Sequence, residues 1–181
     1  MDRRRFIGRA VCFLGGVTLV RGDALFAETF LTVPQAQKVL WGEGVSFEKV
    51  EVLLSKEQMR SISKACKVRV RNAELNVWKT SQGGWFIVDQ VIGKHEHIDM
   101  AVALNADGSV KGLEVMTYRE TYGDEIRHPK WREQFHGKNA TDQLKLGNQI
   151  RNISGATLSC RHVTEGINRL TQTWKQVLQH L

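Results

Sequence analysis

The sequence predicts an α+β fold, a single domain in which an antiparallel sheet meander packs against helices. Three observations support this prediction. The 181 residues are 41% apolar and 25% charged, which suits one globular domain with its own core. Consecutive segments in the middle of the chain have the composition of strands and are joined by short polar turns, as in an antiparallel sheet. The C-terminal part repeats apolar residues at helical spacing, which indicates a long amphipathic helix.

The segment before the meander is predicted to alternate helices with strands. Thr32 and Pro34 mark the start of a helix that Gly42 ends, and Ser55-Lys56-Glu57-Gln58 is a capping-box pattern. The expected elements are helices over 32–42 and 55–66 and strands over 47–54, 67–71 and 76–79. Residues 67–71 alternate basic with apolar side chains, so the basic face of this strand is either solvated or meets a partner.

The meander is expected to have three strands, over 85–92, 95–104 and 110–118. The second strand places four apolar residues on one face, Ile98, Met100, Val102 and Leu104. A polar run at 119–125 leads to a short helix over 129–135, in which Trp131 and Phe135 are expected to pack inward. A polar connection over 139–151 then reaches the long helix, which is expected over 159–180.

Residues 1–27 have the features of a secretory signal. The basic start Asp2-Arg3-Arg4-Arg5 precedes an apolar run from Ala10 to Val20 that is too short to span a bilayer comfortably. The order Arg3-Arg4-x-Phe6-Ile7 favours a signal of the twin-arginine class over a general secretory one. We therefore expect cleavage after Ala27 and an exported, periplasmic protein, with a retained membrane anchor as the alternative.

The net charge of +7 does not indicate binding to nucleic acid. Residues 1–27 hold five arginines and two aspartates, which is +3 of that charge, and the remaining 21 basic and 17 acidic residues leave +4. Scattered charges of that size form a solvated surface and not a patch that tracks phosphates. We therefore expect no nucleic-acid partner.

The cysteines and histidines do not form a recognisable metal-binding or haem-binding motif. Cys66 and Cys160, the two cysteines outside the leader, form either a disulfide, which export permits, or two free thiols. The sequence contains neither Cys-x-x-Cys-His nor paired cysteines at the spacing of a zinc or iron–sulfur site. His95 and His97 point the same way on an expected strand, but no third ligand accompanies them, so we expect no metal site.

A run of small residues, Ser154-Gly155-Ala156-Thr157-Leu158-Ser159, precedes the C-terminal helix. The free backbone N–H groups and the positive dipole end of a helix start suit a phosphate, and Thr157 adds a hydroxyl at the same place. The run is equally consistent with an ordinary helix cap. The residues of the run alone leave both interpretations open.

The order of segments around this run resembles the FMN-binding domain family of Rnf- and Nqr-type electron-transport complexes and related exported proteins. An aliphatic strand with Asp107-Gly108 leads to Glu120-Thr121-Tyr122-Gly123, a helix containing aromatic residues, Gly137-Lys138 and the run 154–159. The resemblance covers about residues 84–170, and the Ser-Gly-Ala-Thr element is its most specific part. It implies an FMN-binding core over 84–181 with a helix and strand region over 28–83 packed on that core, after the signal peptide expected over 1–27 from the leader's own composition.

The resemblance implies FMN as the cofactor and Thr157 as its covalent attachment point, where a flavin transferase forms a phosphoester bond. Further contacts to the cofactor are implied from residues of the same two segments, Ser154, Gly155, Ala156, Leu158 and Ser159 together with Glu120, Thr121 and Gly123. Contacts to the flavin ring are expected from Tyr118, Tyr122 or Trp131. Arg151 departs from the family pattern, which usually has aspartate there; an arginine is able to pair with the phosphate and favours non-covalent binding.

The implied function is the relay of electrons through FMN, with membrane or periplasmic redox proteins as partners. The sequence offers no evident catalytic base, so an electron-transfer flavoprotein is favoured over an enzyme with its own small-molecule substrate, and we predict no catalytic residue. Two alternatives stay open. One is a reductase component that binds FMN non-covalently, and the other is an interaction or assembly module without flavin.

Overall fold

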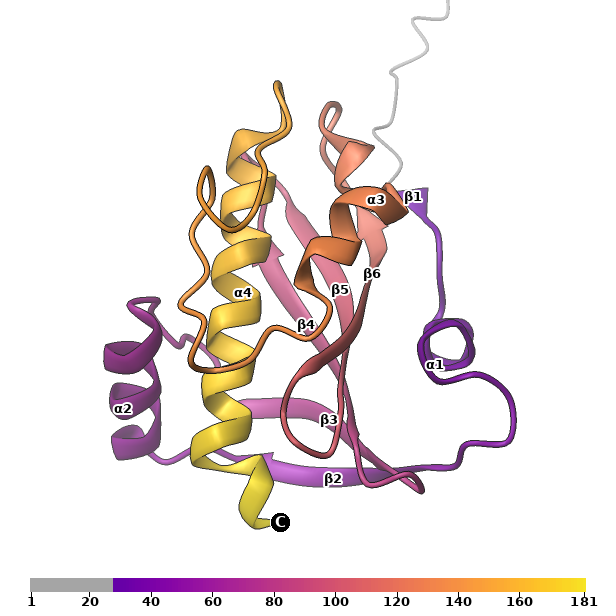
Figure 1. Cartoon of the computed structure of the whole chain (residues 1–181), viewed down its shortest axis with the longest axis vertical. Coiled ribbons are helices and arrows are strands. Elements are labelled where there is room, and N and C mark those ends of the chain that lie inside the picture. Colours follow the sequence, from indigo (N-terminus) through magenta and orange to yellow (C-terminus); the bar gives the residue numbers. More distant parts are fainter. Residues whose placement is uncertain (1–27) are drawn as a thin grey trace, which may run out of the picture.

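The computed structural model describes residues 28–181, so the predicted signal peptide lies outside the described residues. A six-stranded antiparallel sheet runs through the molecule in the order β1-β6-β5-β4-β3-β2 (Figure 1). The strands are β1 (Glu28–Thr29), β2 (Phe47–Leu53), β3 (Glu74–Thr80), β4 (Trp85–Ile92), β5 (His97–Leu104) and β6 (Val110–Tyr118). The three-strand meander is confirmed as β4, β5 and β6, and residues 28–83 contribute the other three strands of the same sheet.

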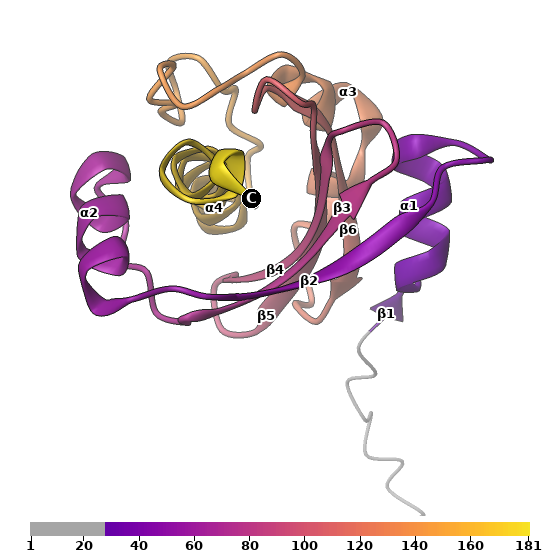
Figure 2. The same ribbon diagram turned by 90° about the horizontal axis from the view of Figure 1, so that it is seen from below.

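The helices lie on both faces of this sheet. They are α1 (Val33–Trp41), α2 (Lys56–Cys66), α3 (Pro129–Arg132) and α4 (Thr157–Gln176), with short 3-10 helices η1 (Asp124–Arg127), η2 (Glu133–Phe135) and η3 (Leu178–His180). Figure 2 shows the sheet curving around α4, while α1 covers the opposite face. The α+β prediction with a long C-terminal helix is confirmed.

The two faces of the sheet are buried in two separate cores, which explains the apolar composition of β5. Its Ile98, Met100, Val102 and Leu104 belong to the larger core under α4, as their shared face predicts. The alternate residues Ala101 and Ala103 belong to the smaller core under α1. Small side chains on that face let α1 approach the sheet closely, because a helix on a sheet needs room for its own side chains.

The capping box predicted at Ser55 is present, and the helix start predicted at Thr32 has a capping box as well. The amide N–H of Thr32 donates to Gln35 Oε1 at the start of α1, and Ser55 and Gln58 exchange the equivalent bonds at the start of α2. The short aromatic segment is also as expected, because Trp131 and Phe135 are buried and their rings meet edge to face with centroids 5.2 Å apart. The local signals in these segments agree with the fold.

The strand predicted over residues 67–71 is wrong. Lys67 ends α2 in the left-handed conformation, with φ of 59°, and the chain then runs to β3 without joining a sheet ladder. The Val70 amide donates to Ser63 Oγ at 2.9 Å, and the Cys66 thiol donates to the Val68 carbonyl at 3.4 Å. Side chains of α2 therefore satisfy backbone groups that a strand would have used.

Two predicted boundaries also change. The second strand of the meander begins at His97 and not at His95, because residues 94–96 form the turn from β4. The long helix begins two residues earlier than expected, at Thr157, and ends at Gln176 before a separate 3-10 turn. The earlier start puts Thr157 inside the first turn of α4.

Candidate functional site

A cavity of about 690 Å³ lies where three loops meet at one end of the sheet. The loops are the β4–β5 turn with Lys94 and His95, residues 120–125 after β6, and residues 155–159 at the start of α4. Its volume lies in the range of small-molecule and cofactor sites. Of the nine residues predicted to contact a cofactor, eight line this one cavity; Ser154 precedes its lining.

The start of α4 presents an uncapped helix terminus to the cavity. Ala156 stands at the N-cap position, and no side chain of residues 28–181 makes a capping hydrogen bond there. The first backbone bond of the helix runs from the Cys160 amide to the Ala156 carbonyl at 2.9 Å, so three amide groups before Cys160 have no acceptor among the described residues. The predicted Ser-Gly-Ala-Thr run thus leaves backbone N–H groups available as hydrogen-bond donors at the cavity. Ser154 does not cap the helix.

The Thr157 hydroxyl is exposed and has one defined partner. The side-chain amide of Asn152 donates to Thr157 Oγ1 at 2.9 Å. The hydroxyl oxygen is therefore an acceptor in this contact, and its own proton is free for another group. Asn152 was not predicted from the sequence, because the five-residue spacing between it and Thr157 belongs to no regular element.

The carboxylate of Glu120 is hydrogen-bonded to the protein backbone. Its Oε1 accepts a hydrogen bond from the amide of Glu96 at 3.0 Å and another from the amide of His95. Desolvation raises the pKa of this carboxyl, but the bonds from the amides of Glu96, His95 and Lys94 outweigh that effect and hold the pKa below its usual value. Glu120 therefore lines the cavity while it fastens the β4–β5 turn to the end of β6.

Tyr118 joins the loop after β6 to the first turn of α4. Its hydroxyl donates to the Tyr122 carbonyl at 2.6 Å and lies 3.2 Å from Ser159 Oγ. Burial raises the pKa of Tyr118, and the nearby carboxylate of Glu120 adds to the shift, so this phenol stays protonated and remains a donor. Ser159, predicted as a cofactor contact, is buried in this bridge.

Gly123 allows the loop to close on the helix. Its φ is +94°, a left-handed conformation that side chains rarely adopt, and a Cβ atom there would lie 2.7 Å from Tyr118 Oη and 3.0 Å from Ala156 Cβ. Two opposite walls of the cavity, residues 120–125 and 155–159, are therefore in direct contact through Gly123.

The three aromatic candidates for ring contacts lie in three different environments. Tyr122 is 82% exposed and lines the cavity, as does the exposed side chain of Leu158. Tyr118 is buried in the bridge to Ser159. Trp131 lies outside the cavity, where its Nε1 donates to the Arg151 carbonyl at 2.8 Å. Tyr122 is thus the aromatic side chain best placed to meet a ring in this cavity.

Arg151 also belongs to another part of the surface. Its side chain lines a separate cavity beside Trp131 and Lys138, and its backbone amide donates to Gln134 Oε1 at 2.8 Å. The basic side chain that lines the cavity with Thr157 is Lys94, and His95 lies beside it in the lining. No role at the cofactor was predicted for His95, because its place beside the cavity depends on how the β4–β5 turn folds toward the start of α4.

The structure distinguishes the two alternatives left open for the cysteines. Cys66 and Cys160 are both free thiols, and burial raises the pKa of each. Residues 28–181 contain no group of three or more side chains arranged to hold a metal ion. Over the same range no helix is both long and apolar enough to cross a membrane.

Comparison with known families indicates a cofactor for the part of the chain that contains this cavity. Residues 93–172 match the family model described as the FMN-binding domain, and all three loops of the cavity lie within this match. This part of the chain is similar to FMN-binding domains. The predicted resemblance and the predicted cofactor, FMN, are confirmed over these residues.

A curated relative with this similarity is one of the subunits of the Na(+)-translocating ferredoxin:NAD(+) oxidoreductase complex of Acetobacterium woodii. The two sequences are 27% identical over 89 residues, which cover 44% of this chain and 43% of the relative. The aligned part is thus less than half of either protein.

Three features of the cavity fit FMN. The uncapped start of α4 offers N–H donors and a positive dipole end to a phosphate. The volume is adequate for a cofactor of this kind, and Tyr122 and Leu158 supply apolar surface for a flat ring. The cavity therefore combines features that suit a phosphate with features that suit a flat ring.

Proposed function

We propose that this protein is an electron-transfer subunit whose FMN is joined to Thr157 by a phosphoester bond. One observation carries the proposal: the exposed Thr157 hydroxyl lies at the uncapped start of a 20-residue helix, inside the cavity of an FMN-binding domain. The similarity to a subunit of an oxidoreductase complex supports a role in electron transfer. FMN supplies the redox chemistry, because it accepts and passes on electrons that no side chain of the cavity carries.

Different residues of the cavity bind different parts of the cofactor. The amide groups of the first turn of α4 bind phosphate oxygens, and the remaining negative charge of a phosphodiester lies at the positive end of the helix dipole. Tyr122 and Leu158 exclude water from the ring. Lys94 brings positive charge to the opposite wall, where Glu120 fixes the turn that carries it.

Attachment requires the Thr157 hydroxyl to act as a nucleophile. We propose that a flavin transferase presents an anhydride of FMN, that Oγ1 forms a bond to the FMN phosphorus, and that the other half of the anhydride leaves. The hydroxyl proton passes to a base of the transferase. The Asn152 amide, 2.9 Å from Oγ1, stabilises the negative charge that develops on this oxygen.

The protein is further proposed to be exported and to exchange electrons with redox proteins at or near a membrane. The basic and apolar composition of residues 1–27 supports export. A covalent link suits an exported protein, because free FMN would be diluted outside the cell and only a tight or covalent complex would keep it bound. The oxidoreductase complex of the relative supports partners that are themselves redox proteins.

Covalent attachment is tested by in-gel flavin fluorescence after co-expression with a flavin transferase. Wild-type protein is expected to give a fluorescent band on a denaturing gel, and Thr157→Val is expected to give none while keeping its fold. Thr121→Val is the matched control, because Thr121 is an exposed threonine on the opposite wall of the same cavity.

The other outcomes separate the alternatives. A fluorescent band from Thr157→Val shows that Thr157 is not the acceptor. Release of all flavin from wild-type protein on denaturation supports a non-covalent FMN protein, and colourless wild-type protein supports a flavin-free module. Arg151 lines a separate cavity, so it is not placed to pair with a phosphate at Thr157 and does not support the non-covalent alternative.

A further inference from the structure

The connection between α2 and β3 carries three cationic side chains that the FMN site does not use. Lys67, Arg69 and Arg71 follow α2 in the segment that was predicted as a strand. In the structure they line a cavity of about 400 Å³ between this connection, the end of β4 and the side of α4. The alternation of basic residues thus faces a hollow and not a flat sheet surface.

The charges around this hollow are not balanced. Among residues 28–181, no carboxylate lies within ion-pair distance of Lys67, Arg69 or Arg71. Arg169 also lines the cavity but is paired with Asp89, and Glu165 is the acidic side chain of the lining. Like charges held close together repel one another, so an anion bound between them gains from every cation.

Hydrogen bonds within the protein hold the elements around this cavity in place. His162 Nδ1 lies 2.7 Å from the Ile92 carbonyl, which ties α4 to the end of β4. The Ser63 hydroxyl accepts the Val70 amide at 2.9 Å and fixes the connection to α2. The cavity is therefore largely preformed, as small-molecule sites usually are.

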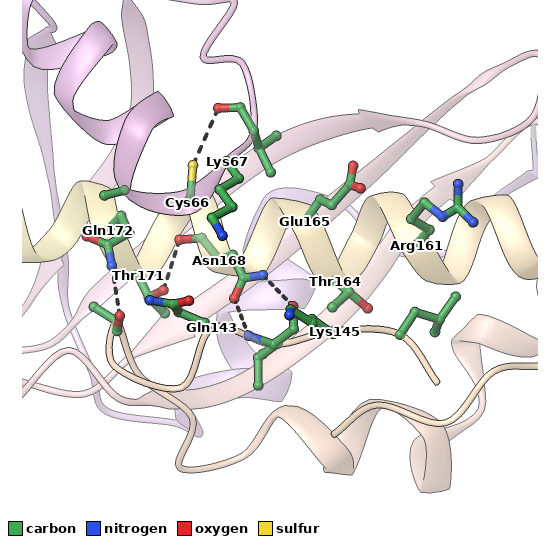
Figure 3. Close-up of a pocket in the computed structure, with 15 residues that line it drawn as sticks. Cys66, Lys67, Gln143, Lys145, Arg161, Thr164, Glu165, Asn168, Thr171 and Gln172 are labelled. Carbon is green, nitrogen blue, oxygen red and sulfur yellow. Dashed lines mark hydrogen bonds between the residues drawn. The ribbon is translucent and has the colours of Figure 1, made fainter. Parts of the chain in front are cut away.

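A neighbouring cavity of about 320 Å³ continues the basic lining on the other side of Val68. Figure 3 shows Lys67 pointing into this cavity toward Asn168, with Glu165 and Arg161 farther along α4. Asn168 exchanges two hydrogen bonds with Leu144, at 2.9 and 2.8 Å, so its side chain already has its partners. The positive side chains, and not these amides, are what remains available to a ligand.

We propose that the cavity lined by Lys67, Arg69 and Arg71 binds a soluble small polyanion that carries two or more phosphate or carboxylate groups. The guanidinium groups of Arg69 and Arg71 suit such groups because each can donate two parallel hydrogen bonds. The apolar side chains of Val91 and Ile92 line the same hollow. This cavity shares no residue with the FMN cavity, so the two ligands bind independently.

The test is titration calorimetry of the flavin-loaded protein with tripolyphosphate and with citrate at constant ionic strength. Wild-type protein is expected to bind at least one of them saturably, and Arg69→Gln/Arg71→Gln is expected to bind it about tenfold more weakly or worse. Lys56→Gln/Arg60→Gln is the matched control, because it removes the same charge from exposed positions of α2 that line neither cavity.

Three results would overturn the proposal. One is the absence of saturable binding by wild-type protein, and another is an equal loss of affinity in both double variants, which would indicate general screening. The third is binding only to phosphatidylcholine vesicles that contain phosphatidic acid, which would make the basic segment a membrane contact. The unfolding temperatures of both double variants show that the comparison is between folded proteins.

Discussion

The contact at Gly123 gives a quantitative test of how the FMN cavity is closed. Gly123→Ala places a methyl group 2.7 Å from Tyr118 Oη and 3.0 Å from Ala156 Cβ. Tyr118 cannot turn away without losing its bonds to the Tyr122 carbonyl and to Ser159, and its ring is buried. The variant is therefore expected to be destabilised by both backbone strain and crowding.

The two effects can be separated with a second glycine. Gly137 also has a positive φ, +72°, but an added Cβ would meet no atom within 4 Å. Both alanine variants should lose about 1–2 kcal/mol for the left-handed conformation. Gly123→Ala should lose about 1–3 kcal/mol more, because overpacking adds that much in a close-packed site.

Urea unfolding of the two variants and the wild type measures these free energies, and the FMN content of each purified protein reports on the cavity. We expect Gly123→Ala to show the larger loss of stability and the lower FMN content, with Gly137→Ala retaining its FMN. Equal destabilisation, or normal FMN content in Gly123→Ala, would refute the view that the loop after β6 closes on the start of α4 through this glycine.

Two further predictions concern the side chains around Thr157. Asn152→Ala should slow covalent flavin attachment about tenfold or more, because one hydrogen bond to the reacting oxygen is lost, and single-turnover labelling measures the rate; an unchanged rate would rule out this role. Glu120→Gln should lower the free energy of unfolding by about 1 kcal/mol at neutral pH, since a charged acceptor of the His95 and Glu96 amides is replaced by a neutral one. Because the folded pKa of Glu120 lies below the ordinary value of 4.5, this stabilisation is present above that pH and is lost as the pH falls through the folded pKa, so wild type and variant should converge in acid-urea titrations. A difference that stays constant from neutral to acid pH would contradict this account.

Much of the fold could be predicted because its signals are local. The capping residues Thr32 and Ser55, the alternation in β5 and the paired aromatics Trp131 and Phe135 all act through neighbours in sequence. The segment 67–71 was mispredicted because its alternation suits a strand, while hydrogen bonds from Ser63 and Cys66 hold it in another conformation. Those competing bonds join residues two and seven positions apart, and such irregular spacing leaves no periodic signal in the sequence.

The site could be predicted in outline for a different reason. A helix start rich in small residues and the Glu120–Gly123 segment were recognisable, and the fold brings both to one cavity. The roles within it were less predictable. Glu120 binds the backbone of the β4–β5 turn, and Asn152, which was not considered, is the side chain bonded to Thr157. Each role depends on which loop lies opposite, and the composition of a single segment does not contain that information.

The most direct test of the central claim is the mass of the protein isolated from its native host, followed by mapping of its peptides. We predict a mass increased by one FMN less one water, carried by the peptide that contains Thr157. The same spectrum reports whether residues 1–27 have been removed. A peptide containing Thr157 that has only its unmodified mass, in protein whose flavin is released on denaturation, would contradict covalent attachment at this residue.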